Sequence, residues 1–137
     1  MREIESILPR PRKQKARCLI IEESPSTQQL LGFALARIGG LEIHRAQSGI
    51  EALRRLTEQH FDLIITNIDP PLMGGVKLLR GIRKDPNHRN VRVVAVSAME
   101  GDEERERVLS LGADECLAMP LHAQAVIDSV KRLLRLA

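Results

Sequence analysis

Polar and acidic residues stand directly after short apolar runs at several points of the chain. In chain order, the residues that follow these runs are Glu22, Glu23, Asn67, Ser97 and Met119. No glycine-rich loop follows the first run, which argues against a dinucleotide or nucleoside triphosphate site. No histidine stands close enough to Ser97 in the sequence to activate its hydroxyl. The spacing therefore indicates neither nucleotide binding nor serine catalysis.

The histidines and cysteines show no pattern of a metal site. The four histidines are scattered, at His44, His60, His88 and His122. The two cysteines, Cys18 and Cys116, are too few for a disulfide framework. Both fall in predicted strands, where a reduced cysteine packs as a small hydrophobe. We expect structural or surface roles for the histidines and two reduced thiols.

From residue 17 onward, short apolar runs alternate five times with longer helical patterns. The runs are 18–21, 42–44, 62–66, 91–96 and 116–118. Three of them are continuous rather than alternating in polarity, as expected for strands buried on both faces of a parallel sheet. The second and fifth runs are weak signals by themselves.

Capping residues and apolar spacing predict five helices between and after these strands. Ser24 and Pro25 open the first helix, which ends at Gly39-Gly40, and Ser48 forms a capping box with Glu51. The third helix carries Leu78, Leu79 and Ile82. The fourth opens on Asp102-Glu103-Glu104, and the fifth has an apolar face within 123–134.

This alternation predicts one α/β domain, a three-layer (βα)5 fold with a doubly wound parallel sheet. A length of 137 residues, with 43% hydrophobic and 28% charged residues, fits a single globular domain. In such a sheet, functional side chains gather at the carboxyl ends of the strands. The residues that follow the apolar runs are therefore the ones to examine.

The basic character of the chain belongs to its N-terminal segment. Residues 1–17 hold six basic and two acidic residues, a balance of +4, whereas 18–137 has a balance of −1. We predict a basic, flexible tail over 1–16 and a domain over 17–137. Contact between the tail and a nucleic acid or an acidic partner stays open.

Two classes of partner are disfavoured for the domain. Phe33 and Phe61 are its only aromatic residues, so it lacks the stacking platforms of single-stranded nucleic-acid binding proteins. No apolar run approaches the length needed to span a bilayer, and no signal-peptide pattern follows Met1. We expect a cytoplasmic location.

The sequence resembles the CheY-like receiver domain of two-component response regulators over essentially all of 17–137. Five segments carry the resemblance: 19–24, 61–75 (with Pro71, Met73 and Gly75 at the family's offsets), 93–98, Gly112-Ala113-Asp114-Glu115 and Pro120. The resemblance implies the strand order 2-1-3-4-5 and a role in phosphorelay signalling.

The departures from the family pattern fall on its chemistry. Asn67 replaces the phosphoacceptor aspartate, and its neutral amide offers no carboxylate nucleophile. Glu22 and Glu23 replace the acidic pair that holds Mg²⁺, and their longer side chains imply at most weak Mg²⁺ binding. The phosphate-pairing lysine, the aromatic switch and the phosphate-contacting hydroxyl of the family correspond to Met119, Cys116 and Ser97.

We interpret the chain as a non-enzymatic pseudo-receiver without a cofactor, which signals by protein–protein contact. The resemblance implies a partner surface on the fourth helix, fifth strand and fifth helix, near Arg105, Arg107, Leu117, Lys131, Arg132 and Arg135. One alternative is a functional phosphoacceptor with atypical chemistry, for which Asp69 would be the substitute, although a strand leading into Pro70-Pro71 need not point that side chain into the pocket. Another is a regulatory fragment of a larger response regulator.

Overall fold

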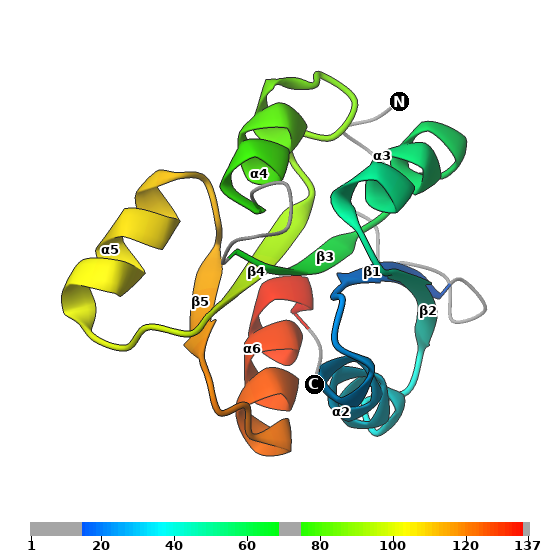
Figure 1. Cartoon of the computed structure of the whole chain (residues 1–137). Helices are drawn as coiled ribbons and strands as arrows, with labels where there is room; N and C mark the ends of the chain where they lie inside the picture. Colours follow the sequence, from blue (N-terminus) through cyan, green and yellow to red (C-terminus); the bar gives the residue numbers. More distant parts are fainter. Residues whose placement is uncertain (1–14, 69–74, 136–137) are drawn as a thin grey trace.

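A computed structural model describes residues 15–68 and 75–135, which form a five-stranded parallel sheet with helices on both faces (Figure 1). The elements in chain order are β1 (Ala16–Ile21), α2 (Pro25–Ala36), β2 (Leu41–Ala46), α3 (Gly49–Glu58), β3 (Leu63–Asn67), α4 (Gly75–Lys84), β4 (Arg92–Ser97), α5 (Asp102–Ser110), β5 (Glu115–Ala118) and α6 (Ala123–Leu134). The strand order is β2-β1-β3-β4-β5. The predicted fold class and strand order are confirmed.

The sheet is buried on both faces because successive side chains of a strand point in opposite directions. Leu19 packs into a cluster with α3, α4 and α5, whereas its neighbours Cys18 and Ile20 pack into a second cluster with α2 and α6. All three side chains are fully buried. This explains why the first apolar run is continuous. Burial also raises the pKa of the Cys18 thiol.

The predicted helix starts are confirmed by their capping contacts. The Thr27 amide donates to Ser24 Oγ over 3.4 Å, and the Glu51 amide donates to Ser48 Oγ over 3.1 Å. The Glu51 carboxylate accepts from the amide of Gln47, one residue earlier than a capping box requires. The local sequence signals therefore fix where α2 and α3 begin.

The strand predicted over 42–44 is too short. β2 runs from Leu41 to Ala46 because all six of its residues pair with β1, from Ala16↔Leu41 to Ile21↔Ala46. β2 is an edge strand with three polar residues (Glu42, His44 and Arg45), so the apolar signal covers only part of the ladder that β1 defines.

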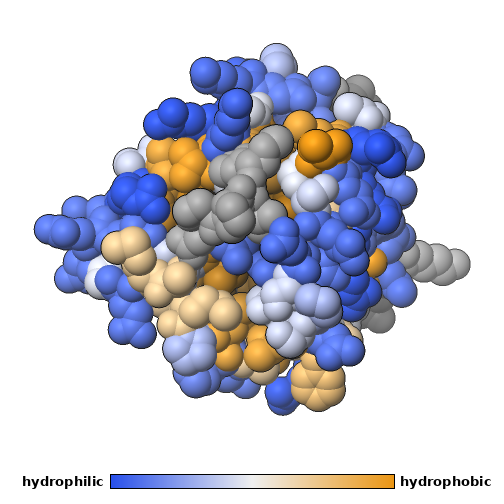
Figure 2. Space-filling model, in the orientation of Figure 1, coloured by the Kyte–Doolittle hydropathy of each residue, from blue (hydrophilic) through white to orange (hydrophobic). Residues whose placement is uncertain are grey.

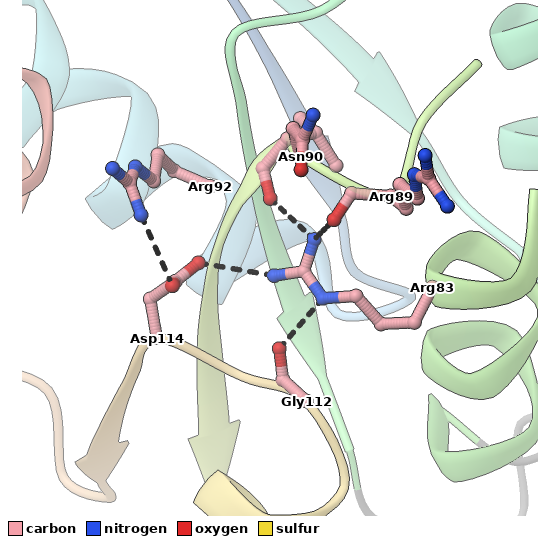
Figure 3. Close-up of a pocket in the computed structure, with 7 residues that line it drawn as sticks. Arg83, Arg89, Asn90, Arg92, Gly112 and Asp114 are labelled. Atoms are coloured by element: carbon pink, nitrogen blue, oxygen red, sulfur yellow. Dashed lines mark hydrogen bonds and ion pairs between the residues drawn. The ribbon is translucent and has the colours of Figure 1, made fainter. Parts of the chain in front are cut away.

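Arg83, near the end of α4, joins three segments at the amino-terminal side of β4 and β5 (Figure 3). Its Nε donates to the Gly112 carbonyl over 2.8 Å, and one terminal nitrogen donates to the carbonyls of Arg89 and Val91 over 2.8 and 2.6 Å. The other terminal nitrogen lies 3.0 Å from Asp114 Oδ2. We call this set of contacts the Arg83 clamp; it lines a polar pocket of about 350 Å³.

The structure bears only in part on the predicted tail and on the expected absence of a membrane-spanning segment. Most of the predicted tail over 1–16 lies outside the described residues, and β1 begins at Ala16. Within 15–68 and 75–135, no helix has the length and apolar character needed to cross a membrane.

Candidate functional site

The carboxyl ends of β1, β3, β4 and β5 meet at one edge of the sheet. The ladders pair Ile21 with Thr66, Asn67 with Val96, and Ser97 with Ala118. The Met119 amide donates to the Ser97 carbonyl over 2.9 Å and continues the last ladder. The residues brought to this edge are therefore Glu22, Asn67, Ser97 and Met119.

The two glutamates after β1 have different surroundings. Glu22 is 5% exposed, and its Oε1 accepts from the Ser24 amide over 3.0 Å. Glu23 is exposed to solvent. Gln28 fixes the backbone here, because its side-chain nitrogen donates to the carbonyls of Glu22 and Ala46. The glutamates thus do not present two equivalent carboxylates, and no group of three acidic, histidine or cysteine residues in the described ranges could hold a metal.

Asn67 is the half-buried last residue of β3 and lies against the start of α4. A Cβ added to Gly75 would lie 2.3 Å from the Asn67 carbonyl oxygen and 2.6 Å from the Ile68 Cα. Only glycine permits this close approach, which explains the family glycine at position 75. The substitute acceptor considered above, Asp69, lies in 69–74, outside the described residues.

Ser97 is fully buried and hydrogen-bonded to a carboxylate from α5. Its Oγ lies 2.5 Å from Glu104 Oε2, and the Met99 amide donates to the same Oγ over 3.2 Å. Arg107 donates to both Glu104 oxygens, over 2.8 and 3.0 Å. Hydrogen bonds from Arg107 and Ser97 hold the pKa of Glu104 below its usual range despite burial.

The sequence interpretation missed Glu104 as a site residue. It was expected only as an acid in the first turn of a helix, where negative charge suits the helix dipole. The overlooked signal is helical spacing: Glu104 stands one turn before Val108, which is fully buried. A glutamate on the buried face of a helix needs a partner, and Ser97 and Arg107 supply it.

The two positions that the resemblance assigns to a lysine and an aromatic switch, Met119 and Cys116, carry uncharged side chains. Met119 is 36% exposed, and Met99 in the β4–α5 connection is 61% exposed. Cys116 is half-buried and packs against the core cluster that contains Phe61. Neither position offers a cation to an anion bound at this edge.

The predicted partner face is formed by α5, β5 and α6. Figure 2 shows apolar side chains gathered over β5, between α5 and α6. Arg132 donates to both oxygens of Glu115, over 2.9 and 2.7 Å, and Ser129 donates to Glu115 Oε1 over 2.9 Å. Two of the predicted cations, Arg107 and Arg132, are thus ion-paired within the chain, while Arg105 is exposed.

A doubly wound parallel sheet in the order β2-β1-β3-β4-β5, with polar residues at its carboxyl edge, is the flavodoxin-like α/β fold. The family model described as response regulator receiver domain matches residues 18–131, and the chain belongs to that family. It is therefore a receiver domain of the two-component type. Receiver domains interact with protein partners such as kinases and effectors.

Individual relatives agree with this assignment. The chain is 32% identical over 115 residues to the polar-differentiation response regulator DivK of Brucella ovis, covering 82% of this chain and 91% of DivK. It is 31% identical over 120 residues to the CpxR homolog of Haemophilus influenzae, covering 88% of this chain but only 51% of that regulator. The receiver domain of a histidine kinase from Syntrophus aciditrophicus has a similar structure, with a TM-score of 0.77, 30% identity and coverage of 88% and 90%.

Proposed function

We propose that this receiver domain does not accept phosphate and signals through a constitutive protein-binding surface. The observation that carries the proposal is Asn67 as the last residue of β3, a position that the resemblance to the family assigns to the acceptor aspartate. An amide nitrogen is not a nucleophile towards a phosphoryl group, so the first chemical step of a phosphorelay has no acceptor there. The domain then acts as a binding module and not as an enzyme.

The surroundings of Asn67 support the same proposal. Mg²⁺ requires nearly octahedral oxygen ligands, but Glu22 has one oxygen bonded to the Ser24 amide and Glu23 is exposed. These residues do not fit a Mg²⁺ site, and we propose that the domain works without a cofactor. Met119 also leaves the edge without the cation that would pair with phosphate.

We place the partner surface on α5, β5 and α6. Arg105 on α5 and Arg135 at the end of α6 are exposed, and apolar side chains gather over β5 between these two helices, a combination suited to a protein partner with an acidic rim. We propose a cytoplasmic location, as the phosphorelay family implies. Because the CpxR homolog is about twice as long as the matched region, a domain within a larger regulator is the second candidate.

The proposal is tested by incubating the chain with acetyl phosphate and Mg²⁺ and measuring its intact mass. A receiver domain with an acceptor aspartate, treated in parallel, shows that the reagent is active. We expect no adduct on the wild-type chain. A single phosphoryl adduct that is labile to hydroxylamine would contradict the proposal, and its loss in Asp69→Asn would identify the atypical acceptor.

A further inference from the structure

The Ser97 hydroxyl has both of its hydrogen-bonding roles filled from within the chain. It lies 2.5 Å from Glu104 Oε2, to which it donates its proton, and it accepts from the Met99 amide. Ser97 is 0% and Glu104 5% exposed, so water does not compete for this contact. Hydrogen bonds to an ionised acceptor are shorter and stronger than those between neutral groups.

The negative charge of Glu104 is neutralised by an arginine on the solvent-facing side of the carboxylate. Arg107, one turn further along α5, donates to both carboxylate oxygens, and its own side chain is 48% exposed. A buried carboxylate costs several kcal/mol unless it is paired and hydrogen-bonded. The pairing keeps Glu104 ionised while it accepts from Ser97.

Glu104 does not cap the N-terminus of α5, although it lies in the first turn of that helix. Gly101, the N-cap of α5, has a φ of 112° and makes no side-chain capping contact. Glu104 is the third residue of the helix, where a capping-box carboxylate would turn back to the N-cap amide. Its carboxylate instead reaches across to the end of β4, so it links the two elements on either side of the 98–101 connection.

We infer that Glu104 is a positioning residue, an internal anion that accepts the hydrogen bond of the Ser97 hydroxyl, which the resemblance to the family would assign to a phosphoryl oxygen. In the family, the hydroxyl at this position contacts the phosphoryl group, and here that hydroxyl already has an anionic acceptor. The 98–101 connection is thereby fixed in one conformation without phosphate. This inference rests on the proposed function, because it assigns the constitutive state of the partner surface to a contact inside the domain.

The test is amide hydrogen exchange in the full chain, read for residues 99–101 relative to core amides of β1 and β3. Glu104→Gln keeps the shape of the side chain but removes its charge, and Glu103→Gln is the matched exposed control. We expect exchange at 99–101 to accelerate on the order of ten-fold in Glu104→Gln and to stay unchanged in the control. Ser97→Ala, which also removes the acceptor of the Met99 amide, should accelerate exchange at least as much as Glu104→Gln, and Ser97→Thr should retain wild-type exchange.

A double variant separates positioning from general destabilisation. Ser97→Ala combined with Glu104→Gln should exchange no faster at 99–101 than the faster single variant, because both substitutions act on the same Ser97–Glu104 hydrogen bond. Additive effects, or exchange in Glu104→Gln within two-fold of wild type, would overturn the inference. The acetyl phosphate assay on the same samples reports on the proposed function separately, because a phosphoryl adduct on the wild-type chain contradicts that function whatever the exchange rates show.

Discussion

Glu115, on the proposed partner face, is hydrogen-bonded and ion-paired within the domain. It accepts from Arg132 and Ser129, both on α6, and so fastens β5 to that helix. Hydrogen bonds from Arg132 outweigh partial burial and hold the pKa of Glu115 below its usual range. The charge of Arg132 is therefore already neutralised by Glu115 within the domain.

This arrangement predicts a particular pH dependence of stability. A carboxyl whose folded pKa is lowered stabilises the fold above its unfolded pKa, about 4.3, and that contribution is lost as the pH falls through the lower folded value. Arg132→Gln should return the pKa of Glu115 towards its usual range and flatten the loss of stability between about pH 5 and 3. Urea unfolding at several pH values measures this, with Arg135→Gln as the control. Parallel wild-type and Arg132→Gln profiles would show that the pair does not couple to folding.

Residue types alone were sufficient to locate Asn67, Ser97 and Met119, because each directly follows an apolar run. They were insufficient for Glu104, because its role depends on which face of α5 packs against the sheet. The sequence also does not show that Glu22 is buried and Glu23 exposed. Burial of one and exposure of the other follow from the path of the chain after β1.

Among the elements, α4 is held most specifically, through the Arg83 clamp. Four acceptors from the α4–β4 connection and the α5–β5 connection converge on one guanidinium (Figure 3). Three of them are backbone carbonyls, so the clamp depends on the paths of the segments more than on their side chains. Asp114 adds a charge and also accepts from the Val93 amide, which aligns β4 with the loop before β5.

Removing the clamp should destabilise the whole domain. Arg83→Met keeps most of the aliphatic volume but removes the side-chain donor of three carbonyls and one of the donors to the half-buried Asp114 carboxylate. We expect a loss of about 2–4 kcal/mol in the free energy of unfolding, since hydrogen bonds to charged groups contribute about 1.5–3 kcal/mol each and partial solvation offsets part of the sum. Denaturant unfolding measures the change. Arg80→Met, exposed one turn earlier on α4, should stay within about 0.5 kcal/mol of wild type, and an equal effect in both variants would contradict the role of the clamp.

Elements whose ends are set by capping side chains could be predicted from the sequence. Elements whose ends are set by pairing with another strand could be predicted only in part. Ser24 and Ser48 mark helix starts by their own side chains, and both predictions are confirmed. β2 extends beyond its apolar signal because β1 supplies the ladder. Arg83 was not singled out, because its acceptors lie up to 31 residues away and come together only in the fold.

For the whole molecule, alternation of short apolar runs with capped helices was enough to predict the fold. The strand order came from the resemblance and is confirmed. It places β3 and β4 between the strands that carry Cys18 and Cys116, and both cysteines are thiols as predicted. The sheet also brings the strand-end residues to one edge, which is a property of parallel topology rather than of any local motif.

Restoring the acceptor should change the response of the whole domain to Mg²⁺. Asn67→Asp would form a cluster of two carboxylates with the buried Glu22 at the strand-end edge, and Met119 supplies no cation to relieve their repulsion. We expect its melting temperature to fall by about 2–5 °C without Mg²⁺ and to recover at millimolar Mg²⁺, while wild type changes little. Thermal melts with and without Mg²⁺ measure this. Asn67→Ser, which adds no charge, is the control, and a melting temperature of Asn67→Asp that is independent of Mg²⁺ would contradict the expected carboxylate cluster.

The Arg83 clamp also determines how α4 can move. The helix has ten residues and is about 15 Å long, with its C-terminal end fixed by the clamp and its first residue against the end of β3. With its C-terminal end fixed, α4 can move only by rotating about Arg83. A tilt of α4 by about 10° around Arg83 would displace Gly75, which lies about 12 Å along the helix from Arg83, by roughly 2 Å relative to Asn67. A disturbance at the strand-end edge would therefore appear as a rotation of α4, largest beside the edge and close to zero at the clamp.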